Sequence, residues 1–245
     1  MREIFTIIFV ILSLGLCGQI QEQHLSDDLH YLKNIRFFVQ KQSDSTHKLP
    51  LTLVNLCSQL MNQKKKSSNE LVFLKKVFLK VQQTYFKTYD QFSTLEILLN
   101  EGRYDCVSGT SLYALILNTL GFKVEIHETP FHTFLLVFLS NNQRVLVEST
   151  SPGYGVITGD AKITEMIHQF TYLNRQKLLE DVIVLDRHIS IQELAGLENY
   201  NQAVYHFNKQ EYQKANEYLD QALRLYPCDR VNALKDLNQE VYAGQ

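Results

Sequence analysis

The hydrophobic pattern of the chain changes its period at Gly121, and this change restricts the fold more than any other feature of the sequence. Residues 106–120 predict a buried helix, because the stretch 112–117 leaves that helix almost no polar face. Gly121 follows in the position that commonly ends a helix. Three strands of an antiparallel meander are predicted next, at residues 123–127, 133–139 and 144–148. A buried helix followed by such a sheet predicts an α+β core.

Helical patterns precede this core. The chain holds only 10 Gly and 4 Pro among 245 residues, which favours long helices over a turn-rich β-sandwich. Four helices are expected: one capped by Ser26-Asp27-Asp28 and continuing to Phe38, one after Pro50, one at 68–89, and a short one from Ser93 or Thr94 to Gly102. Cys57 lies in the second helix and is expected in the core. This part of the sequence shows no chemistry of its own.

The C-terminal part has the residue spacing of a tetratricopeptide repeat. Small, aromatic and helix-ending residues occupy the repeat positions Ala203, Tyr212, Ala215, Leu219, Ala222 and Pro227. A further helix follows at residues 231–241. One repeat is present, whereas about three are needed to stand alone. The helices therefore either pack on the core or recruit a protein partner.

The first residues have the pattern of a signal peptide. Arg2 supplies a positive charge, and the apolar run from Ile4 to Cys17 is too short to span a bilayer. We expect cleavage before Gly18 and an exported chain, periplasmic or secreted. A lipid anchor on Cys17 is the alternative, which Leu16 disfavours because lipoprotein signals carry a small residue there. No later stretch reaches the length of a membrane span, so no integral membrane segment is expected in the mature chain.

Together, these sequence patterns divide the chain into three parts: a signal peptide at 1–18, a core domain with its N-terminal helices at 19–188, and the repeat-like helices at 189–245.

The charge balance does not indicate nucleic acid as a partner, because the chain has 24 Lys and Arg and 26 Asp and Glu, for a net charge of −2. The one basic run, Lys64-Lys65-Lys66, is interpreted as a solvated loop.

The cysteines point to chemistry. Cleavage would leave Cys57, Cys106 and Cys228, an odd and widely spread set that is no disulfide framework. At least one thiol then stays free or pairs between chains. In an oxidising compartment a free thiol is explained by deep burial or by chemistry.

Cys106 has the position of a nucleophile. A thiol in the first turn of a helix lies near the positive end of the helix dipole and near unsatisfied backbone N–H groups, which favour the thiolate and can hold an oxyanion. A general base is needed beside it. His132, at the start of the central strand, is the best-placed histidine, and Glu148, at the end of the next strand, is the candidate to orient it. Taken singly, Cys106 is equally well explained as a buried core thiol and His132 as a satisfied histidine at a strand end.

The hairpin loop decides whether Glu148 can take this role. A two-residue loop at Asn141-Asn142 would pair residues whose numbers sum to about 283 and would place Ser149 on the face of His132. A three-residue loop lowers that sum to about 282. Glu148 then becomes a same-face diagonal neighbour of His132 at ~7–8 Å, within reach of a Glu side chain. The triad therefore predicts an odd loop or a bulge.

Metal binding is a weaker interpretation. The segment from His127 to His132 resembles a zinc-protease motif, but it has one residue too many, and Pro130 prevents the helix that would bring both histidines to one face. The sequence holds no Cys-x-x-Cys pair. We therefore assign no metal and no cofactor.

Cys106 opening a helix, His132 starting a strand and Glu148-Ser149-Thr150 closing the next strand resemble the transglutaminase-like superfamily of papain-type cysteine enzymes. In that family a Cys, a His and usually an Asp follow in this order, and the C-terminal repeat resembles a bacterial branch of it. The resemblance covers roughly residues 90–155 and 190–230. It implies a papain-like core with Cys106 as nucleophile, His132 as base and Glu148 as orienting acid. Glu stands where the family usually has Asp, and the chain has no Trp.

Two functions agree with these features of the sequence. The first is an exported enzyme that forms a thioester at Cys106 from an amide or peptide bond of a protein or peptide substrate, with hydrolysis favoured over transfer. The second is a non-catalytic scaffold that keeps this core and binds a protein partner through its repeat-like helices. A Cys106 too far from His132 to meet it would favour the scaffold.

Overall fold

Helix α5 (Cys106–Thr119) is the centre of the computed structural model, which describes residues 30–38, 50–130, 132–175 and 186–244. Twelve of its 14 residues are buried. At its C-terminus Gly121 has a φ of +74°, and the N–H of Phe122 donates to the carbonyl of Leu117. This is the hydrogen bonding of a glycine-terminated helix. The predicted buried helix and its glycine end are therefore confirmed.

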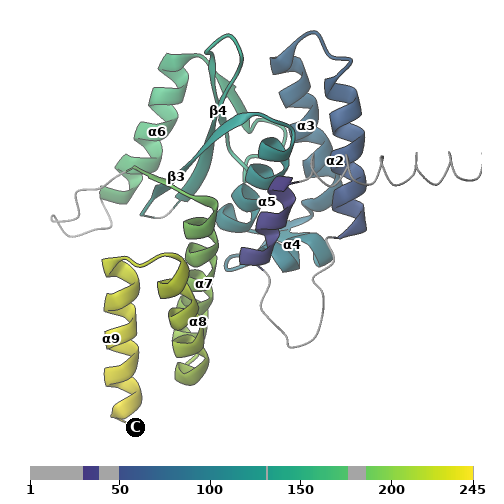
Figure 1. Cartoon of the computed structure of the whole chain (residues 1–245). Coiled ribbons are helices and arrows are strands. Elements are labelled where there is room, and N and C mark those ends of the chain that lie inside the picture. The colour runs from purple at the N-terminus through teal and green to yellow at the C-terminus, as the bar shows by residue number, and fades with distance from the viewer. Residues whose placement is uncertain (1–29, 39–49, 131, 176–185, 245) are drawn as a thin grey trace, which may run out of the picture.

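An antiparallel sheet of five strands follows α5, as the α+β prediction requires (Figure 1). The order of its strands is β6-β5-β4-β3-β7, with bounds β3 Lys123–Thr129, β4 His132–Phe138, β5 Arg144–Val147, β6 Val156–Thr158 and β7 Arg187–Ile189. The three predicted strands are confirmed as β3, β4 and β5. Strands β6 and β7 were not predicted, because three residues are too few for an alternating pattern to be recognised.

The two faces of the sheet carry different cores. Leu135 and Val137 of β4 belong to the main hydrophobic cluster, which includes α5. Phe134 and Leu136, which alternate with them, belong to a second cluster under helix α6 (Asp160–Arg175). Figure 1 shows α5 and α6 on opposite sides of β3 and β4. Helix α6 was not predicted, and its presence explains why β4 is apolar on both faces.

The N-terminal helices cover the main core. They are the 3-10 helix η1 (His30–Phe37) and the α-helices α2 (Leu51–Lys64), α3 (Glu70–Tyr85) and α4 (Leu95–Glu101). The buried residues Leu32 and Ile35 of η1, and Phe38 directly after it, recur at every third position, which matches three residues per turn. Thr94 caps α4, and Cys57 is fully buried in α2, both as expected.

The expectation that the third helix continues to residue 89 is wrong. Helix α3 ends at Tyr85, and Phe86 already has extended dihedral angles. Two short parallel strands follow from this end, β1 (Thr88–Tyr89) and β2 (Arg103–Tyr104). The pairing holds the chain beside the start of α5, so that Tyr89 lies close to the candidate nucleophile instead of on a helix.

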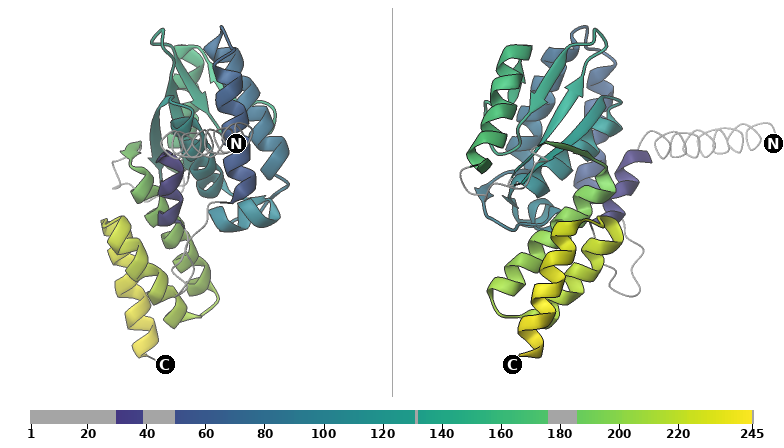
Figure 2. Two further views of the ribbon diagram at one scale, coloured as in Figure 1. Left: turned by 45° about the vertical axis from the view of Figure 1, so that its right-hand side comes forward. Right: turned by 90° about the vertical axis from the view of Figure 1, so that its left-hand side faces the viewer.

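Three helices complete the fold: α7 (Ile191–Asn208), α8 (Tyr212–Leu225) and α9 (Asp229–Ala243). Ala203, Ala215 and Ala222 are fully buried where these helices pack. The first turns of α7 belong to the main core, in which Leu194 and Leu197 are buried. Figure 2 shows α8 and α9 extending away from the sheet. The repeat-like helices are thus continuous with the core.

The predicted signal peptide and Cys17 lie outside the described residues. Among the helices that the structure describes, none is long and apolar enough to cross a membrane.

Glu198 of α7 generates a prediction about this packing. The side chain is 4% exposed and accepts a hydrogen bond of 2.8 Å from the backbone N–H of Leu95, the first residue of α4. Burial raises the pKa of Glu198 well above its ordinary value of 4.5. The folded protein therefore keeps a proton that the unfolded chain releases, and stability falls as the pH rises above about 4.5.

Glu198→Gln imitates the protonated acid and keeps an acceptor for Leu95. We expect this variant to have a higher free energy of unfolding than the wild type at pH 8 and nearly the same at pH 4, measured by urea denaturation. Glu217→Gln, an exposed position of α8, is the control and should show no such difference. An equal loss of stability at both pH values would contradict the argument.

Candidate active site

Cys106 is the first residue of α5. Asp105 caps the helix: its carboxylate accepts from the backbone N–H of Ser108 at 2.8 Å, and the Ser108 hydroxyl accepts from the backbone N–H of Asp105 at 2.9 Å. Burial raises the pKa of Asp105 to about 6, although the hydrogen bonds from Ser108 act against this shift. The capping box fixes the first turn, and the N–H of Cys106 is one of the four that an α-helix leaves without an internal partner.

His132 begins β4 and pairs across the hairpin with Thr129. Its Nε2 lies 2.5 Å from Oε2 of Glu148. The Cys106 thiol lies beside the same imidazole and acts to raise the pKa of His132, both as a hydrogen-bond partner and through its charge. The structure therefore brings all three residues singled out in the sequence into one series of side-chain contacts.

The register that the triad required is present. Strands β4 and β5 pair Leu135 with Val147 and Phe138 with Arg144, so paired residue numbers sum to 282. The loop consists of the three residues Ser140 to Asn142, and Asn142 has a φ of +63°. A left-handed residue in a three-residue hairpin loop is common, and Asn tolerates it. The predicted odd loop is thus confirmed.

The Glu148 carboxylate is almost fully buried, with 2% of the side chain exposed. Its second oxygen, Oε1, accepts from the backbone N–H of Thr150 at 2.8 Å and from the Thr150 hydroxyl at 2.6 Å. Both oxygens are therefore occupied, and the carboxylate is held in one orientation toward His132.

These contacts control the charge of His132. Burial disfavours the imidazolium, but the hydrogen bonds to Cys106 and Glu148 and their charges outweigh burial and raise the pKa of His132 to about 10. At neutral pH the imidazole is therefore protonated in this arrangement. A protonated imidazole beside a thiol stabilises the thiolate, the nucleophilic form.

Close packing holds the two strands against α5. A Cβ added to Gly109 would lie 2.8 Å from the hydroxyl oxygen and 2.9 Å from the Cβ of Ser149, next to Glu148. The Thr133 hydroxyl donates to the carbonyl of Cys106 at 2.9 Å, and the Thr110 hydroxyl donates to the carbonyl of Thr133 at 3.2 Å. The start of β4 and the end of β5 are thus fixed relative to the thiol.

Cys106 and His132 line a cleft of about 710 Å³. Its other lining residues are Tyr89, Gln91, Phe92, Asp105, Val107, Glu128, Thr129, Pro130, Thr133, Arg187, Leu197, Tyr200, Asn201, Val204, Tyr226, Cys228, Asp229 and Arg230. One wall belongs to the core and the facing wall to α7 and to the start of α9. The thiol and the imidazole are therefore open to a ligand of peptide size.

A buried charge cluster joins the two walls. Glu128 of β3 accepts hydrogen bonds from the Tyr226 hydroxyl and the Arg230 guanidinium. Arg230 also lies over the ring of Tyr200, with its Cζ 4.8 Å from the ring centroid. The carboxylate is thereby neutralised, and the C-terminal helices are tied to the strand that precedes His132.

The other two described cysteines and His127 have surroundings that differ from those of Cys106 and His132. Cys57, Cys106 and Cys228 are all free thiols. Burial raises the pKa of Cys57 to about 12, which makes it inert, whereas Cys228 lines the cleft. His127 bonds to Asp186 through Nδ1 at 2.8 Å. In the part of the chain that the structure describes, no group of three metal-binding side chains was found.

Two further residues contribute to the site and were not predicted from the sequence. The ring of Phe170 in α6 lies 4.5 Å from that of His132 and covers the imidazole on the far side of the sheet. Nothing in the local sequence signals this contact, because it joins residues from two separate elements. Thr150 lies within the Glu148-Ser149-Thr150 sequence, but its two hydrogen bonds to Glu148 follow from the turn after β5.

The shifted pKa of His132 yields a prediction about charge. Because the pKa in the folded state, about 10, exceeds the ordinary 6.5, the pair contributes stability that is complete below pH 6.5 and lost as the pH rises through about 10. We expect the His132 ring to remain protonated at pH 8 by nuclear magnetic resonance. Glu148→Gln should lower this pKa, whereas Glu125→Gln, which removes a carboxylate near His127, should not. A wild-type ring that titrates near pH 6.5 would refute the arrangement.

The contact between Gly109 and Ser149 yields a second prediction. Gly109→Ala should lower the free energy of unfolding by ~1–3 kcal/mol through overpacking, against the gain of up to ~1 kcal/mol that alanine normally brings to a helix. Ser149→Gly removes the opposing atoms and should reduce that cost by about 1 kcal/mol or more in a double-mutant cycle. An identical cost in both backgrounds would show that the contact does not limit the packing.

A scan of the chain against protein-family models gives no match. A search of the curated proteins likewise gives no significant match. The assignment of a function therefore depends on the geometry of the cleft.

Proposed function

We propose that this chain is a transglutaminase-like cysteine hydrolase that cleaves amide or peptide bonds through a thioester at Cys106. The observation that carries the proposal is the series of contacts from Cys106 to His132 to Glu148 at the wall of an open cleft. A nucleophile, a base within hydrogen-bonding reach and a third group that orients the base are the parts that covalent acyl transfer requires. The same geometry counts against the scaffold, for which the thiol and imidazole need not meet.

In the first half of the reaction, the Cys106 thiolate attacks the carbonyl carbon of the substrate. The negative charge that develops on the carbonyl oxygen is stabilised by backbone N–H groups at the start of α5, including that of Cys106. Protonated His132 then gives its proton to the leaving amine, and the C–N bond breaks. A thioester and a neutral imidazole result, with Glu148 holding the ring in place.

In the second half, the neutral imidazole takes a proton from water, which attacks the thioester. The carboxylic acid product leaves as the Cys106 sulfur regains its electron pair, and His132 is again protonated. Hydrolysis is favoured over transfer to an amine because water reaches an open cleft without a second binding site. A protein or peptide substrate agrees with the size of the cleft and with its aromatic lining.

The fold class and the location belong to the same proposal. The support for a transglutaminase-like fold is the thiol at the N-terminus of a buried helix, packed on an antiparallel sheet that supplies His132 and Glu148 from neighbouring strands. The N-terminal pattern of Arg2 followed by an apolar run supports export. In this proposal the repeat-like helices form a wall of the substrate cleft.

The first experiment measures alkylation of Cys106 by iodoacetamide at pH 6, in a Cys57→Ser/Cys228→Ser background so that the signal has one source. Because only the thiolate reacts, we expect a rate about tenfold or more above that of free cysteine. His132→Ala should remove this excess, whereas His127→Ala, on the neighbouring strand, should retain it. On peptide amide substrates Cys106→Ala should then abolish hydrolysis.

A slow alkylation that ignores His132 would sink the enzymatic proposal and favour the scaffold. Hydrolysis that persists undiminished in Cys106→Ala would show that another site does the chemistry.

A further inference from the structure

Residues 50–87 carry a charge opposite to that of the rest of the chain. They contain seven lysines and one acidic residue, Glu70, for a net charge of +6. Because the whole chain has a net charge of −2, the remaining residues together carry −8. Glu70 is itself engaged, because its carboxylate accepts from the backbone N–H of Ser140 at 2.7 Å. A uniform solvated surface would mix both signs, so this segment has a distinct cationic face.

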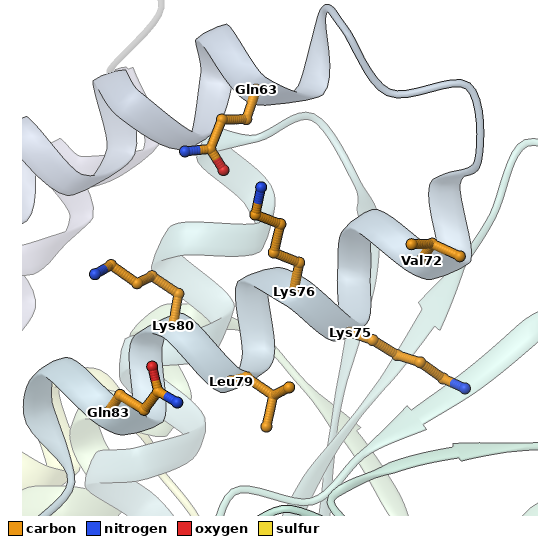
Figure 3. Close-up of a pocket in the computed structure, with 7 residues that line it drawn as sticks. All are labelled: Gln63, Val72, Lys75, Lys76, Leu79, Lys80 and Gln83. Atoms are coloured by element: carbon orange, nitrogen blue, oxygen red, sulfur yellow. The ribbon is translucent and has the colours of Figure 1, made fainter.

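The outer side of α3 concentrates this charge. The lining of a shallow hollow of about 600 Å³ against α2 consists of Val72, Lys75, Lys76, Leu79, Lys80, Gln83 and, from α2, Gln63. The six positions on α3 are spaced by three, one, three, one and three residues, which places them on one helical stripe (Figure 3). We call this stripe the basic face of α3.

Apolar side chains interrupt the lysines on this face. Val72 is 60% exposed and Leu79 is 44% exposed, although α3 buries other apolar side chains against the core. Figure 3 shows the side chains of Val72 and Leu79 on the same helix as those of the three lysines. Exposed apolar groups flanked by lysines are typical of a helix face that binds a surface with anionic groups on the outside and an apolar layer below them.

The lysines on this face have no partners within the described part of the chain. No carboxylate there forms an ion pair with Lys75, Lys76 or Lys80. Lys64 differs, because its Nζ donates to the carbonyl of Leu120 at 2.7 Å and lies over the ring of Phe122. The expectation of a solvated loop is therefore wrong for Lys64, which ends α2 and is used structurally.

We propose that the basic face of α3 binds the surface of an anionic lipid bilayer. Lipid headgroups would neutralise Lys75, Lys76 and Lys80, while Val72 and Leu79 would enter the interface between headgroups and acyl chains. A nucleic acid fits less well, because the stripe holds neither an arginine nor an aromatic ring for a base to stack on. The contact is peripheral, and it is independent of the chemistry at Cys106.

The test compares binding of the full chain to vesicles of phosphatidylcholine alone and to equimolar phosphatidylcholine and phosphatidylglycerol. Any contribution of the apolar N-terminal residues is common to both vesicles and cancels in the ratio. We expect a strong preference for the anionic vesicles that declines as salt is added. Each lysine near an anionic surface contributes about fivefold, so the triple variant Lys75→Glu/Lys76→Glu/Lys80→Glu should lower the anionic partition by about 100-fold or more.

The control is a second triple variant, Lys162→Glu/Lys209→Glu/Lys214→Glu, which changes the net charge equally but at exposed positions of α6 to α8. It should retain most of the preference. Leu79→Ser should weaken binding to anionic vesicles and leave the circular dichroism spectrum unchanged.

Three results would overturn the proposal. The first is a wild type without preference for anionic vesicles, and the second is an equal loss in both triple variants. The third is binding to heparin or single-stranded DNA through these lysines without binding to vesicles, which would assign the face to a soluble polyanion.

Discussion

The contact of Gly109 with Ser149 brings the second turn of α5 against the chain that leaves β5, and the geometry of the site follows from it. A helix residue with a Cβ would push that chain away from the thiol. At the same level, the Thr133 hydroxyl ties β4 to the carbonyl of Cys106. With both strands held against one helix turn, a thiol, an imidazole and a carboxylate from three elements come together. Such positional accuracy requires support from rigid elements rather than loops.

The charges of the site are consistent with its burial. A carboxylate as buried as that of Glu148 is costly unless it is paired and hydrogen-bonded. Here His132 supplies the positive charge, and Thr150 supplies two further hydrogen bonds. The same pairing raises the pKa of His132, so the arrangement that makes the buried carboxylate tolerable also keeps the imidazole protonated beside Cys106.

The sequence allowed the site to be predicted wherever the relevant signal was local. Helix α5, its glycine end and the three central strands follow from hydrophobic period, and the three-residue loop follows from requiring Glu148 on the face of His132. Helix α6 was missed, although the apolar run of β4 already needed cover on both faces. The bond of Arg230 to Glu128 joins residues 102 positions apart, and no periodicity reports such a contact. For the same reason, the repeat-like spacing predicted helices without predicting that they face the thiol.

The placement of these helices determines what the smallest functional unit is. Nine of the 20 residues that line the cleft follow residue 186 in the sequence. Removing α7 to α9 would expose Leu194 and Leu197 from the main core and would leave Glu128, 6% exposed, without the cation and the hydroxyl that neutralise it. A buried carboxylate that loses both partners destabilises the strand on which it lies, and that strand leads directly into His132. The C-terminal helices therefore support the position of His132 as well as shaping the cleft, and the core and the repeat-like segment act as one unit.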